Sequence, residues 1–284
     1  MHDVFYFTDI HGMYDLYRAI MDYCLTQDPE CTIIFGGDAI DRGPDGYKIM
    51  KELIANPQVT YLKGNHEDMF VQAAERIYDD YKGKLTGELI KNYLYNRMYD
   101  DQVISLSIQN GGFNTLYDWM LDGMSMDLIM RLKLLPLAEQ YRNLDFCHAC
   151  GDPKIYKRVI RNEYNGIPVS SDNTDMMIWD RNWLGFGWAP DRICVFGHTP
   201  SFHLPAKYYG QDKSTFHAHP CKYVGMIDNR LTGYRISMDT GAAISGRAYV
   251  LNCNTMQAIG FRDMDFENEE IHKHNIEKIE VIQF

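Results

Sequence analysis

Three short apolar runs near the N-terminus, each followed by a polar junction, restrict the possible folds more than any other feature of this sequence. The runs span Val4–Thr8, Ile33–Phe35 and Val59–Leu62, and helical patterns from about Tyr14 to Gln27 and from about Asp45 to Asn56 separate them. Short continuous apolar runs are typical of strands buried on both faces, and strands that alternate with helices form parallel sheets. The pattern therefore predicts a parallel β-α-β-α-β unit with right-handed crossovers.

The junctions after these runs carry carboxylate, amide and imidazole groups. Asp9 and His11 follow the first run, Asp38 follows the second, and Asn65 follows the third. Ligands of α/β folds bind beyond the carboxyl ends of parallel strands, so these side chains are expected to converge. Alternate residues of an extended segment point the same way, so Asp9 and His11 can bind one ion. The two oxygens of Asp38 can bridge to a second ion about 3.5–4 Å away.

Two histidines later in the chain extend this set. His148 and His198 follow the β-type apolar runs Leu144–Cys147 and Ile193–Phe196. A mixture of nitrogen and oxygen donors without thiolate favours manganese, iron or zinc over calcium. An isolated Asp-x-His sequence would indicate only a turn or a surface pair. Six such donors at successive strand ends instead predict a site for two divalent metal ions.

The rest of the sequence is predicted to complete a single domain, residues 1–284, with a helical insertion and a charged tail. From about 77 to 135 the strand signal disappears, and Leu85–Tyr99 and Phe113–Met120 show helical spacing. Leu137–Gln140 and Leu144–Cys147 resemble a hairpin. The other expected elements are polar loops at 151–175 and 200–225, strands at 193–196 and near 234–239, 247–253 and 256–262, and a charged tail from about 263 to 284.

Composition limits the expected partners and location. The chain has 28 Lys and Arg against 39 Asp and Glu, and the net charge of −11 argues against binding to nucleic acid or anionic membranes. The N-terminus lacks a basic and apolar leader, and no uninterrupted apolar segment reaches about 18 residues, so a cytoplasmic protein is expected. Seven cysteines, several in strand-like runs, suit reduced core thiols better than a disulfide framework. The oligomeric state is left open.

Five short blocks make the chain resemble the calcineurin-like metallophosphoesterases. They are Asp9–Gly12, Gly37–Gly43, Gly64–Glu67, Cys147–Ala149 and Gly197–Pro200, in the order of the family's signature blocks. The Asp-Arg-Gly ending of the second block and the Glu after the third are similar to the phosphoprotein phosphatase branch, and especially to its lambda-phage-type and bacterial members. The resemblance implies an α/β fold in the form of a four-layer metallophosphoesterase-like β-sandwich flanked by helices.

The resemblance also implies which residues hold metal. The first ion would be held by Asp9, His11 and Asp38. The second would be held by Asp38, Asn65, His148 and His198. In branches whose last block is Gly-His-x-His a further histidine reaches the first ion, but here Pro200 stands in its place. The first ion is therefore expected to keep a position open to water.

The remaining implied roles concern the phosphate group. Its oxygens would be bound by Arg42, Arg181 and Asn65. The fixed fork of the guanidinium group suits the two arginines to this task. A hydroxide that bridges the two metals would attack phosphorus in line, without a phosphoenzyme. His66, oriented by Asp41, would protonate the leaving oxygen.

Three other groups of residues have simpler explanations. Cys147-x-x-Cys150 surrounds His148, but without a second pair its thiols are better explained as packing groups than as a zinc or redox site. A histidine-rich loop suits solvation better than an extra metal site, and it contains His203, His217, His219 and Cys221. The tyrosines of the insertion suit either a substrate surface or helix packing, and they are Tyr78, Tyr81, Tyr93, Tyr95 and Tyr99.

Three functions remain under consideration. The first is a metal-dependent serine/threonine-type protein phosphatase that also accepts phosphotyrosine and small aryl phosphates, with phosphoproteins, phosphopeptides or small phosphoesters as partners. The second is a symmetrical diadenosine tetraphosphate hydrolase, whose extra phosphates would need basic groups such as Lys154, Lys157, Arg158 and Arg161. The third is a non-catalytic binding module. Such a module is expected to have lost a metal ligand or the acid, and every such position is filled here.

Overall fold

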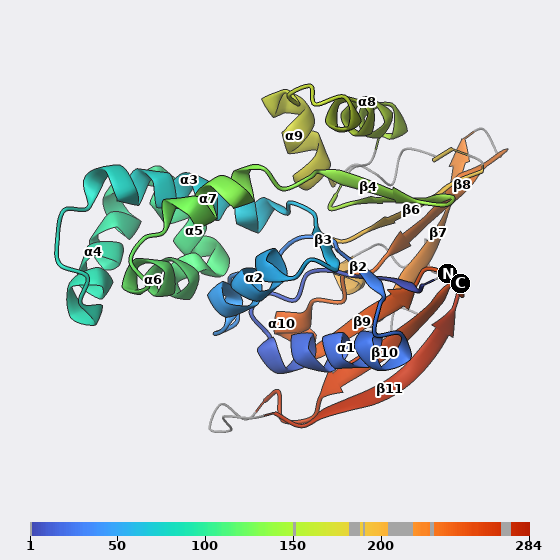
Figure 1. Cartoon of the computed structure of the whole chain (residues 1–284), viewed down its shortest axis with the longest axis horizontal. Helices are drawn as coiled ribbons and strands as arrows, with labels where there is room; N and C mark the ends of the chain where they lie inside the picture. The colour runs from blue at the N-terminus through green and yellow to red at the C-terminus, as the bar shows by residue number, and fades with distance from the viewer. Residues whose placement is uncertain are drawn as a thin grey trace.

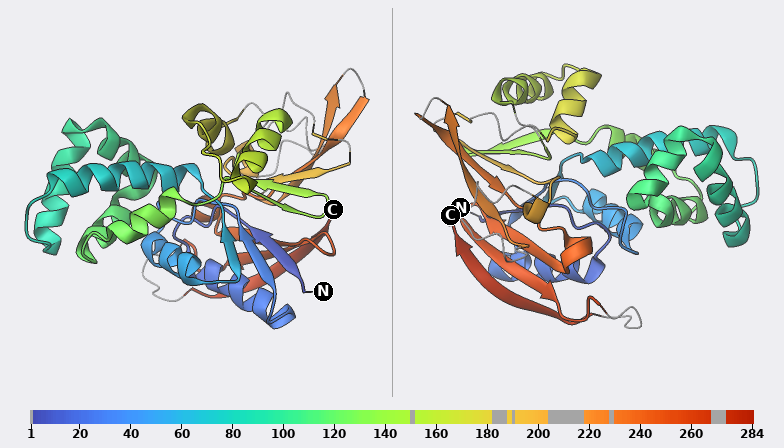
Figure 2. Two further views of the ribbon diagram at one scale, coloured as in Figure 1. Left: turned by 45° about the horizontal axis from the view of Figure 1, so that its top comes forward. Right: turned by 180° about the vertical axis from the view of Figure 1, so that it is seen from behind.

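The computed structural model describes residues 2–149, 152–181, 188–189, 191–203, 218–227, 230–267 and 274–284. Two β-sheets stack face to face, and helices cover the outer face of each (Figure 1). A lobe of further helices projects from one side of the stacked sheets (Figure 2). The predicted α/β fold with a four-layer sandwich is therefore confirmed.

The first sheet has six strands in the order β11-β10-β9-β1-β2-β3. Their bounds are β1 Val4–Phe7, β2 Thr32–Phe35, β3 Val59–Tyr61, β9 Arg247–Asn252, β10 Gln257–Asp263 and β11 Ile276–Gln283. β1, β2 and β3 pair in parallel, as predicted, and β9, β10 and β11 extend the sheet in antiparallel order. The charged tail therefore contains a strand that sequence analysis missed. Isoleucines three residues apart in β11 conceal the usual period of two, and the strand lies at a sheet edge beside a bulge in β10.

The side chains of β1 alternate between two cores. Phe5 and Phe7 pack in the cluster that includes helices α1 (Tyr14–Gln27) and α2 (Gly46–Ala55). Tyr6 faces the second sheet, where its ring lies 5.0 Å from that of Phe146. Successive strand residues point to opposite faces, so a strand between two cores needs an unbroken apolar run. The apolar run Val4–Phe7 is therefore explained by the burial of β1 on both faces.

The second sheet has five strands in the order β4-β5-β6-β8-β7. Their bounds are β4 Ala138–Tyr141, β5 Leu144–Cys147, β6 Ile193–Phe196, β7 Cys221–Ile227 and β8 Arg230–Ser237. β4 and β5 form the predicted hairpin, while β5, β6 and β8 run parallel. β7 and the start of β8 lie in segments for which no strand was predicted. Two short helices follow the strand ends, η3 at Ser201–His203 and α10 at Ala242–Ser245.

The segment 151–175, predicted as a polar loop, instead contains helices α8 (Pro153–Tyr164) and α9 (Ser171–Ile178). Only three residues of α8 are buried, and they lie on one face against the second sheet: Tyr156, Val159 and Ile160. Because only this narrow apolar stripe interrupts a basic sequence, the sequence showed no clear helical periodicity here. The sequence nevertheless marks the start of α8, because an Asp followed by a proline is typical of a helix N-terminus. In the structure the Asp152 side chain accepts a hydrogen bond from the Lys154 backbone N–H, and the proline occupies the first turn.

The projecting lobe is built from five helices and one π-helical turn. They are α3 Asn65–Asp80, α4 Gly87–Asp100, α5 Gln102–Ser107, the π-helical turn η1 Ile108–Gly112, α6 Phe113–Leu121 and α7 Met126–Lys133. The predicted helices at 85–99 and 113–120 correspond to α4 and α6, whereas α5 and α7 were not predicted. Trp119 is fully buried at the centre, with its ring edge-on to Phe70. Throughout the described ranges, each helix is too short or too polar to traverse a lipid bilayer.

Candidate metal centre

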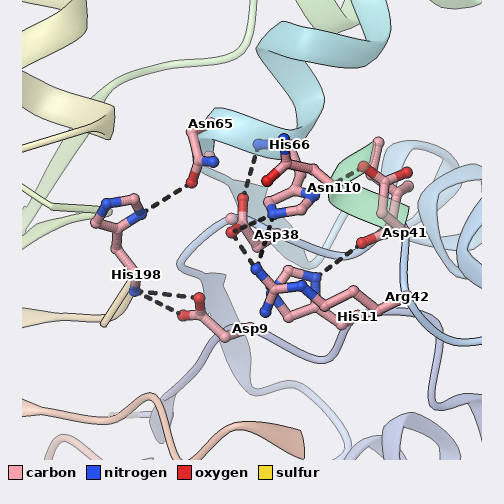
Figure 3. A network of polar contacts seen from close by, with 12 residues as sticks. Asp9, His11, Asp38, Asp41, Arg42, Asn65, His66, Asn110 and His198 are labelled. Atoms are coloured by element: carbon pink, nitrogen blue, oxygen red, sulfur yellow. Dashed lines mark hydrogen bonds and ion pairs between the residues drawn. The ribbon is translucent and has the colours of Figure 1, made fainter. Parts of the chain in front are cut away.

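The predicted ligand residues gather where strands of both sheets end. Asp9 and His11 follow β1, Asp38 follows β2, and Asn65 begins α3 just after β3. From the second sheet, His148 follows β5 and His198 follows β6. All six side chains are buried, as is His66. Figure 3 shows the side chains of Asp9, His11, Asn65, His66 and His198 arranged around Asp38.

The backbone at this centre is unusual. Six of its non-glycine residues adopt positive φ values, namely Asp9, His11, Asp38, Asp41, Arg42 and His198. Hydrogen bonds between loops hold this conformation, since the N–H of His11 donates to the Asp38 carbonyl at 3.0 Å. Gly37 has φ 97°, and a Cβ there would lie 2.7 Å from the Gly64 nitrogen. Strained backbone of this kind persists only where its surroundings impose it, and it concentrates at functional sites.

The Asp38 carboxylate is the hub of the arrangement. Its Oδ2 lies 3.4 Å from His148 Nε2, 3.6 Å from His11 Nε2 and 3.9 Å from His66 Nε2. Its Oδ1 accepts a hydrogen bond from the His66 backbone N–H at 3.0 Å. Three imidazoles from two sheets therefore face one carboxylate oxygen.

Backbone carbonyls orient two of these imidazoles. His11 Nδ1 lies 2.9 Å from the Ile40 carbonyl, and His148 Nδ1 lies 2.8 Å from the Gly36 carbonyl. A carbonyl oxygen can only accept, so both Nδ1 atoms carry protons and the Nε2 atoms face Asp38. Metal-binding histidines are commonly oriented in this way by the nitrogen that does not bind the ion.

A second convergence involves Asn65. Its Oδ1 lies 2.9 Å from His198 Nδ1 and 3.1 Å from His148 Nε2. This amide oxygen, two imidazoles and the nearby Asp38 carboxylate form a mixed oxygen and nitrogen set. Divalent first-row transition metals are bound by such sets.

The residues fit a pair of divalent ions. Two groups have ligand atoms within 4.8 Å of one another, one made of His11, Asp38 and His66, the other of Asp38, His148 and His198. Asp38 belongs to both groups, as a bridging ligand must. The Nε2 atoms of His11 and His198 are buried without a hydrogen-bond partner, an arrangement that bound cations would satisfy.

Asp9 lies beside these groups rather than within them. Both of its carboxylate oxygens accept a hydrogen bond from the His198 backbone N–H at 3.1 Å, and Oδ2 also accepts one from Thr8 Oγ1 at 2.6 Å. Burial and the neighbouring Asp239 raise the pKa of Asp9 well above its ordinary value. A Cβ at Gly197 would collide with Asp9 Oδ2, so this approach of the two loops requires glycine.

The electrostatics of the centre favour positive charge near Asp38. Burial opposes ionisation of Asp38, but the imidazoles of His148 and His66 lower its pKa well below the ordinary value. Burial also opposes charge on His148, yet Asp38 raises the pKa of His148 to about 10. Burial, together with neighbouring histidines, lowers the pKa values of His11 and His198. Those two imidazoles are therefore neutral, the form in which histidine binds metal.

His66 is tied to Asp41 and Arg42 at the edge of the centre. His66 Nδ1 lies 2.7 Å from Asp41 Oδ2, and the other oxygen of Asp41 accepts a hydrogen bond from Thr115 Oγ1 at 2.8 Å. Arg42 is exposed, and its Nη2 lies 3.1 Å from His66 Nε2. Burial acts to lower the pKa of His66, but Asp38 and Asp41 outweigh it and raise that pKa. Thr115, which lies on α6 of the lobe, was not identified from the sequence.

Glu67 braces the loops without facing the centre. Its two buried carboxylate oxygens accept hydrogen bonds at 2.9 Å from the backbone N–H groups of Asp38, Ala39 and Gly64. Tyr61 donates a further hydrogen bond at 2.7 Å. Sequence analysis used Glu67 only as part of a family block. Its position three residues into a helix that follows a glycine was the available signal, because a Glu there can bind back to the helix start.

The other predicted residues lie outside the two groups. Arg181 is exposed and donates to Thr199 Oγ1 at 3.5 Å, next to His198 on the chain. Cys147 Sγ lies 3.9 Å from Cys194 Sγ in the core of the second sheet. Within the described residues, His203, His219 and Cys221 join no metal-binding group. Cys150 and His217 lie outside the described residues.

Comparisons with known proteins indicate the family of this chain. A model of the calcineurin-like phosphoesterase family matches residues 3–202. A symmetrical bis(5'-nucleosyl)-tetraphosphatase of Buchnera aphidicola subsp. Acyrthosiphon pisum (strain 5A) is 27% identical over 89 residues, which cover 31% of this chain and 32% of that protein. Serine/threonine-protein phosphatase 2 of Escherichia coli (strain K12) is 38% identical over 68 residues, which cover 24% of this chain and 30% of that protein.

These matches to curated relatives span about a third of each relative's length. A crystal structure provisionally assigned as a diadenosine tetraphosphatase covers 91% of this chain and 92% of its own chain, with a TM-score of 0.53 and 14% identity. At that identity the likeness concerns the fold alone.

Proposed function

The chain belongs to the calcineurin-like phosphoesterase family, and from this premise we propose that it is a metal-dependent phosphatase that hydrolyses phosphomonoesters. Phosphoserine and phosphothreonine in proteins are the proposed substrates. The observation that carries the proposal is Asp38, which is shared by two groups of buried metal-binding side chains and lies next to the His66–Asp41 pair. The similarity of a short segment to serine/threonine-protein phosphatase 2 supports the choice of substrate.

The proposed metal ligands are those that the sequence suggested. The first ion would be held by Asp9, His11 and Asp38, and the second by Asp38, Asn65, His148 and His198. Manganese is the proposed ion, with iron or zinc as alternatives, because the donors mix nitrogen and oxygen. When bound, two such ions activate water as a nucleophile and neutralise the charge of a phosphate group.

The chain's own residues would do the rest. We propose that Arg42 turns from His66 Nε2 to bind phosphate oxygens, with Asn65 and Arg181 as further phosphate contacts. His66 would then protonate the leaving oxygen through Nε2, because Asp41 holds its Nδ1–H and favours the charged imidazole. Arg42 and Arg181 are both exposed, as contacts with a phosphate group on the surface of a protein would require.

A second candidate is the symmetrical hydrolysis of diadenosine tetraphosphate. The observation that favours it is a basic stripe on α8, formed by Lys154, Lys157, Arg158 and Arg161. All four side chains are exposed and follow the helical spacing of one face. Such a stripe suits a substrate that carries several phosphates, and a curated relative with that activity matches part of the chain.

One comparison of substrates tests the proposal. The purified protein with Mn²⁺ is offered a phosphoserine peptide, a phosphotyrosine peptide, p-nitrophenyl phosphate and diadenosine tetraphosphate, and kcat/KM is measured for each. The phosphoserine peptide is expected to give the highest value, and His66→Asn serves as the inactive control. Preference for the dinucleotide by orders of magnitude would overturn the proposal in favour of the second candidate.

A further inference from the structure

Asp239 is a buried carboxylate that the site described above does not use. It follows β8, and only 1% of its surface is exposed. Oδ1 accepts a hydrogen bond from the Gly241 N–H at 2.8 Å, whereas Oδ2 is buried without a hydrogen-bond partner. A buried carboxylate oxygen without a partner is costly, so such a group calls for a nearby cation.

The sheet register places Asp239 beside His198. Strands β6 and β8 are parallel neighbours in which Phe196 pairs with Ser237. His198 and Asp239 each lie two residues beyond that pair, at the same edge of the sheet. The two loops remain in contact, because the Ser201 N–H donates to the Asp239 carbonyl at 2.9 Å.

Hydrogen bonds connect this edge of the second sheet to Asp9, because the His198 backbone N–H donates to both oxygens of the Asp9 carboxylate at 3.1 Å. After burial itself, the charge of Asp239 is the largest influence that raises the pKa of Asp9. Burial raises the pKa of Asp239, and among charged groups Arg42 lowers that pKa whereas Asp38 raises it. Three carboxylates, those of Asp9, Asp38 and Asp239, are therefore buried where strands of the two sheets end.

We propose that Asp239 is a further acidic residue of the first metal site, where it supplies negative charge and a hydrogen-bond acceptor next to the ion held by Asp9, His11 and Asp38. The inference rests on the proposed function for that ligand set. The backbone of Asp239 contacts the loop that contains Pro200, a residue whose side chain has no metal-binding atom. Water that completes the surroundings of the ion would donate to Asp239 Oδ2.

Charge balance also supports a role for Asp239 at the metal site. Two divalent ions bring four positive charges, and the proposed ligands Asp9 and Asp38 supply two negative ones. Asp239 supplies a third. Acidic groups just outside the ligands of a metal ion are a recognised means of tuning its affinity, and their loss commonly costs about 10–100-fold in binding.

The test measures binding of Mn²⁺ alone to the metal-free protein by isothermal titration calorimetry. Asp239→Asn is expected to weaken one of the two Mn²⁺ affinities by about 10–100-fold and to leave the other nearly unchanged. Asp263→Asn is the matched control, because Asp263 is also buried at a strand end but pairs with His274. The control is expected to leave both affinities unchanged. Unchanged affinities in Asp239→Asn would overturn the proposal.

Thermal unfolding adds a second readout. Metal-free Asp239→Asn is expected to unfold at a higher temperature than the metal-free wild type, because a buried carboxylate is removed. The rise in Tm on addition of Mn²⁺ is expected to be smaller for the variant than for the wild type. An equal Tm rise in both proteins would count against the proposal. If Asp239→Asn does not fold, Asp239→Ser takes its place in both measurements. No substrate is involved, so a wrong substrate assignment would leave this result intact, whereas a wild type without Mn²⁺ binding would overturn both proposals.

Discussion

Individual carboxylates at this centre have separable tasks. Asp38 faces three imidazoles, Asp41 pairs with His66, and Glu67 accepts hydrogen bonds from backbone N–H groups and from Tyr61. Burial and the nearby Asp38 raise the pKa of Glu67, whereas the imidazoles lower the pKa of Asp38. The difference follows from the charged neighbours, since Glu67 lies near the negative charge of Asp38, whereas Asp38 lies near imidazoles that can carry positive charge.

His66 provides the sharpest test at this scale, because its Nε2 also lies near His11 and Asp38. Replacing it by Asn is expected to lower kcat by about 10²–10⁴-fold, the usual contribution of a general acid. The Mn²⁺ content, measured by elemental analysis, is expected to equal that of the wild type. Asp68→Asn on the same helix serves as the control and should leave both quantities unchanged. Loss of Mn²⁺ from the His66 variant would show that His66 is a ligand.

Among the elements, the π-helical turn of the lobe contacts the loop that carries Arg42. The Arg42 N–H donates to the Gly111 carbonyl at 3.0 Å, and Gly111 lies in the π-helical turn η1 with φ 95°. A Cβ at Gly111 would lie 2.7 Å from the Arg42 nitrogen. The lobe therefore supports the position of Arg42, and Gly111 is needed both for its left-handed backbone and for this close approach.

The start of α5 allows a test of the lobe's stability. Asp101 accepts hydrogen bonds from the N–H groups of Val103 and Ile104, and Arg76 donates to it at 2.8 Å. Asp101→Ala is expected to lower the free energy of unfolding by about 1 kcal/mol, as measured by urea denaturation at neutral pH. Asp100→Ala, the exposed neighbour, should change it little.

The same variant has an expected pH dependence. Burial acts to raise the pKa of Asp101, but Arg76 and the helix N–H groups lower it below its ordinary value. A carboxyl whose pKa is lowered by folding stabilises the protein above the pKa of the unfolded chain, and this stabilisation is lost as the pH falls through the folded-state pKa. The difference between wild type and Asp101→Ala should therefore shrink in acid. A difference that stays constant down to low pH would contradict the charged cap.

At the scale of the whole molecule, the centre joins two sheets. Loops after β1 and β2 contribute Asp9, His11 and Asp38, and loops after β5 and β6 contribute His148 and His198. The core between the sheets, which includes Tyr6 and Phe146, holds them in register. Ions at this edge would bind both halves of the sandwich at once.

Metal binding is therefore expected to stabilise the entire fold. A free Mn²⁺ concentration of about 100 times Kd should add roughly 2.7 kcal/mol to the free energy of unfolding, because the unfolded chain offers no assembled site. The measurement is the Tm with Mn²⁺ and after its removal by EDTA. Ca²⁺ at the same concentration is the control and should raise Tm less, since it prefers sites made of oxygen alone. A Tm that does not change with Mn²⁺ would contradict the paired-ion site.

Much of this arrangement could be predicted from short stretches of the sequence. Helix α1 has the predicted bounds Tyr14–Gln27, and the three parallel strands lie where apolar runs precede Asp9, Asp38 and Asn65. Strand ends in a parallel sheet share one edge, so donors at those ends were expected to meet. Helix α8 was missed because a helix that buries only three residues on one face leaves a weak periodic signal.

The sequence by itself determined the alternation of strands and helices and the donor residues at the strand ends, because both depend on neighbours within a few positions. Only the tertiary structure decided which atoms meet. Thr115 reaches Asp41 from the lobe, Glu67 spans two loops, and Asp239 lies beside His198 through the pairing of β6 with β8. Such contacts depend on sheet register and on the stacking of two sheets, and these are settled by packing between residues far apart in the chain.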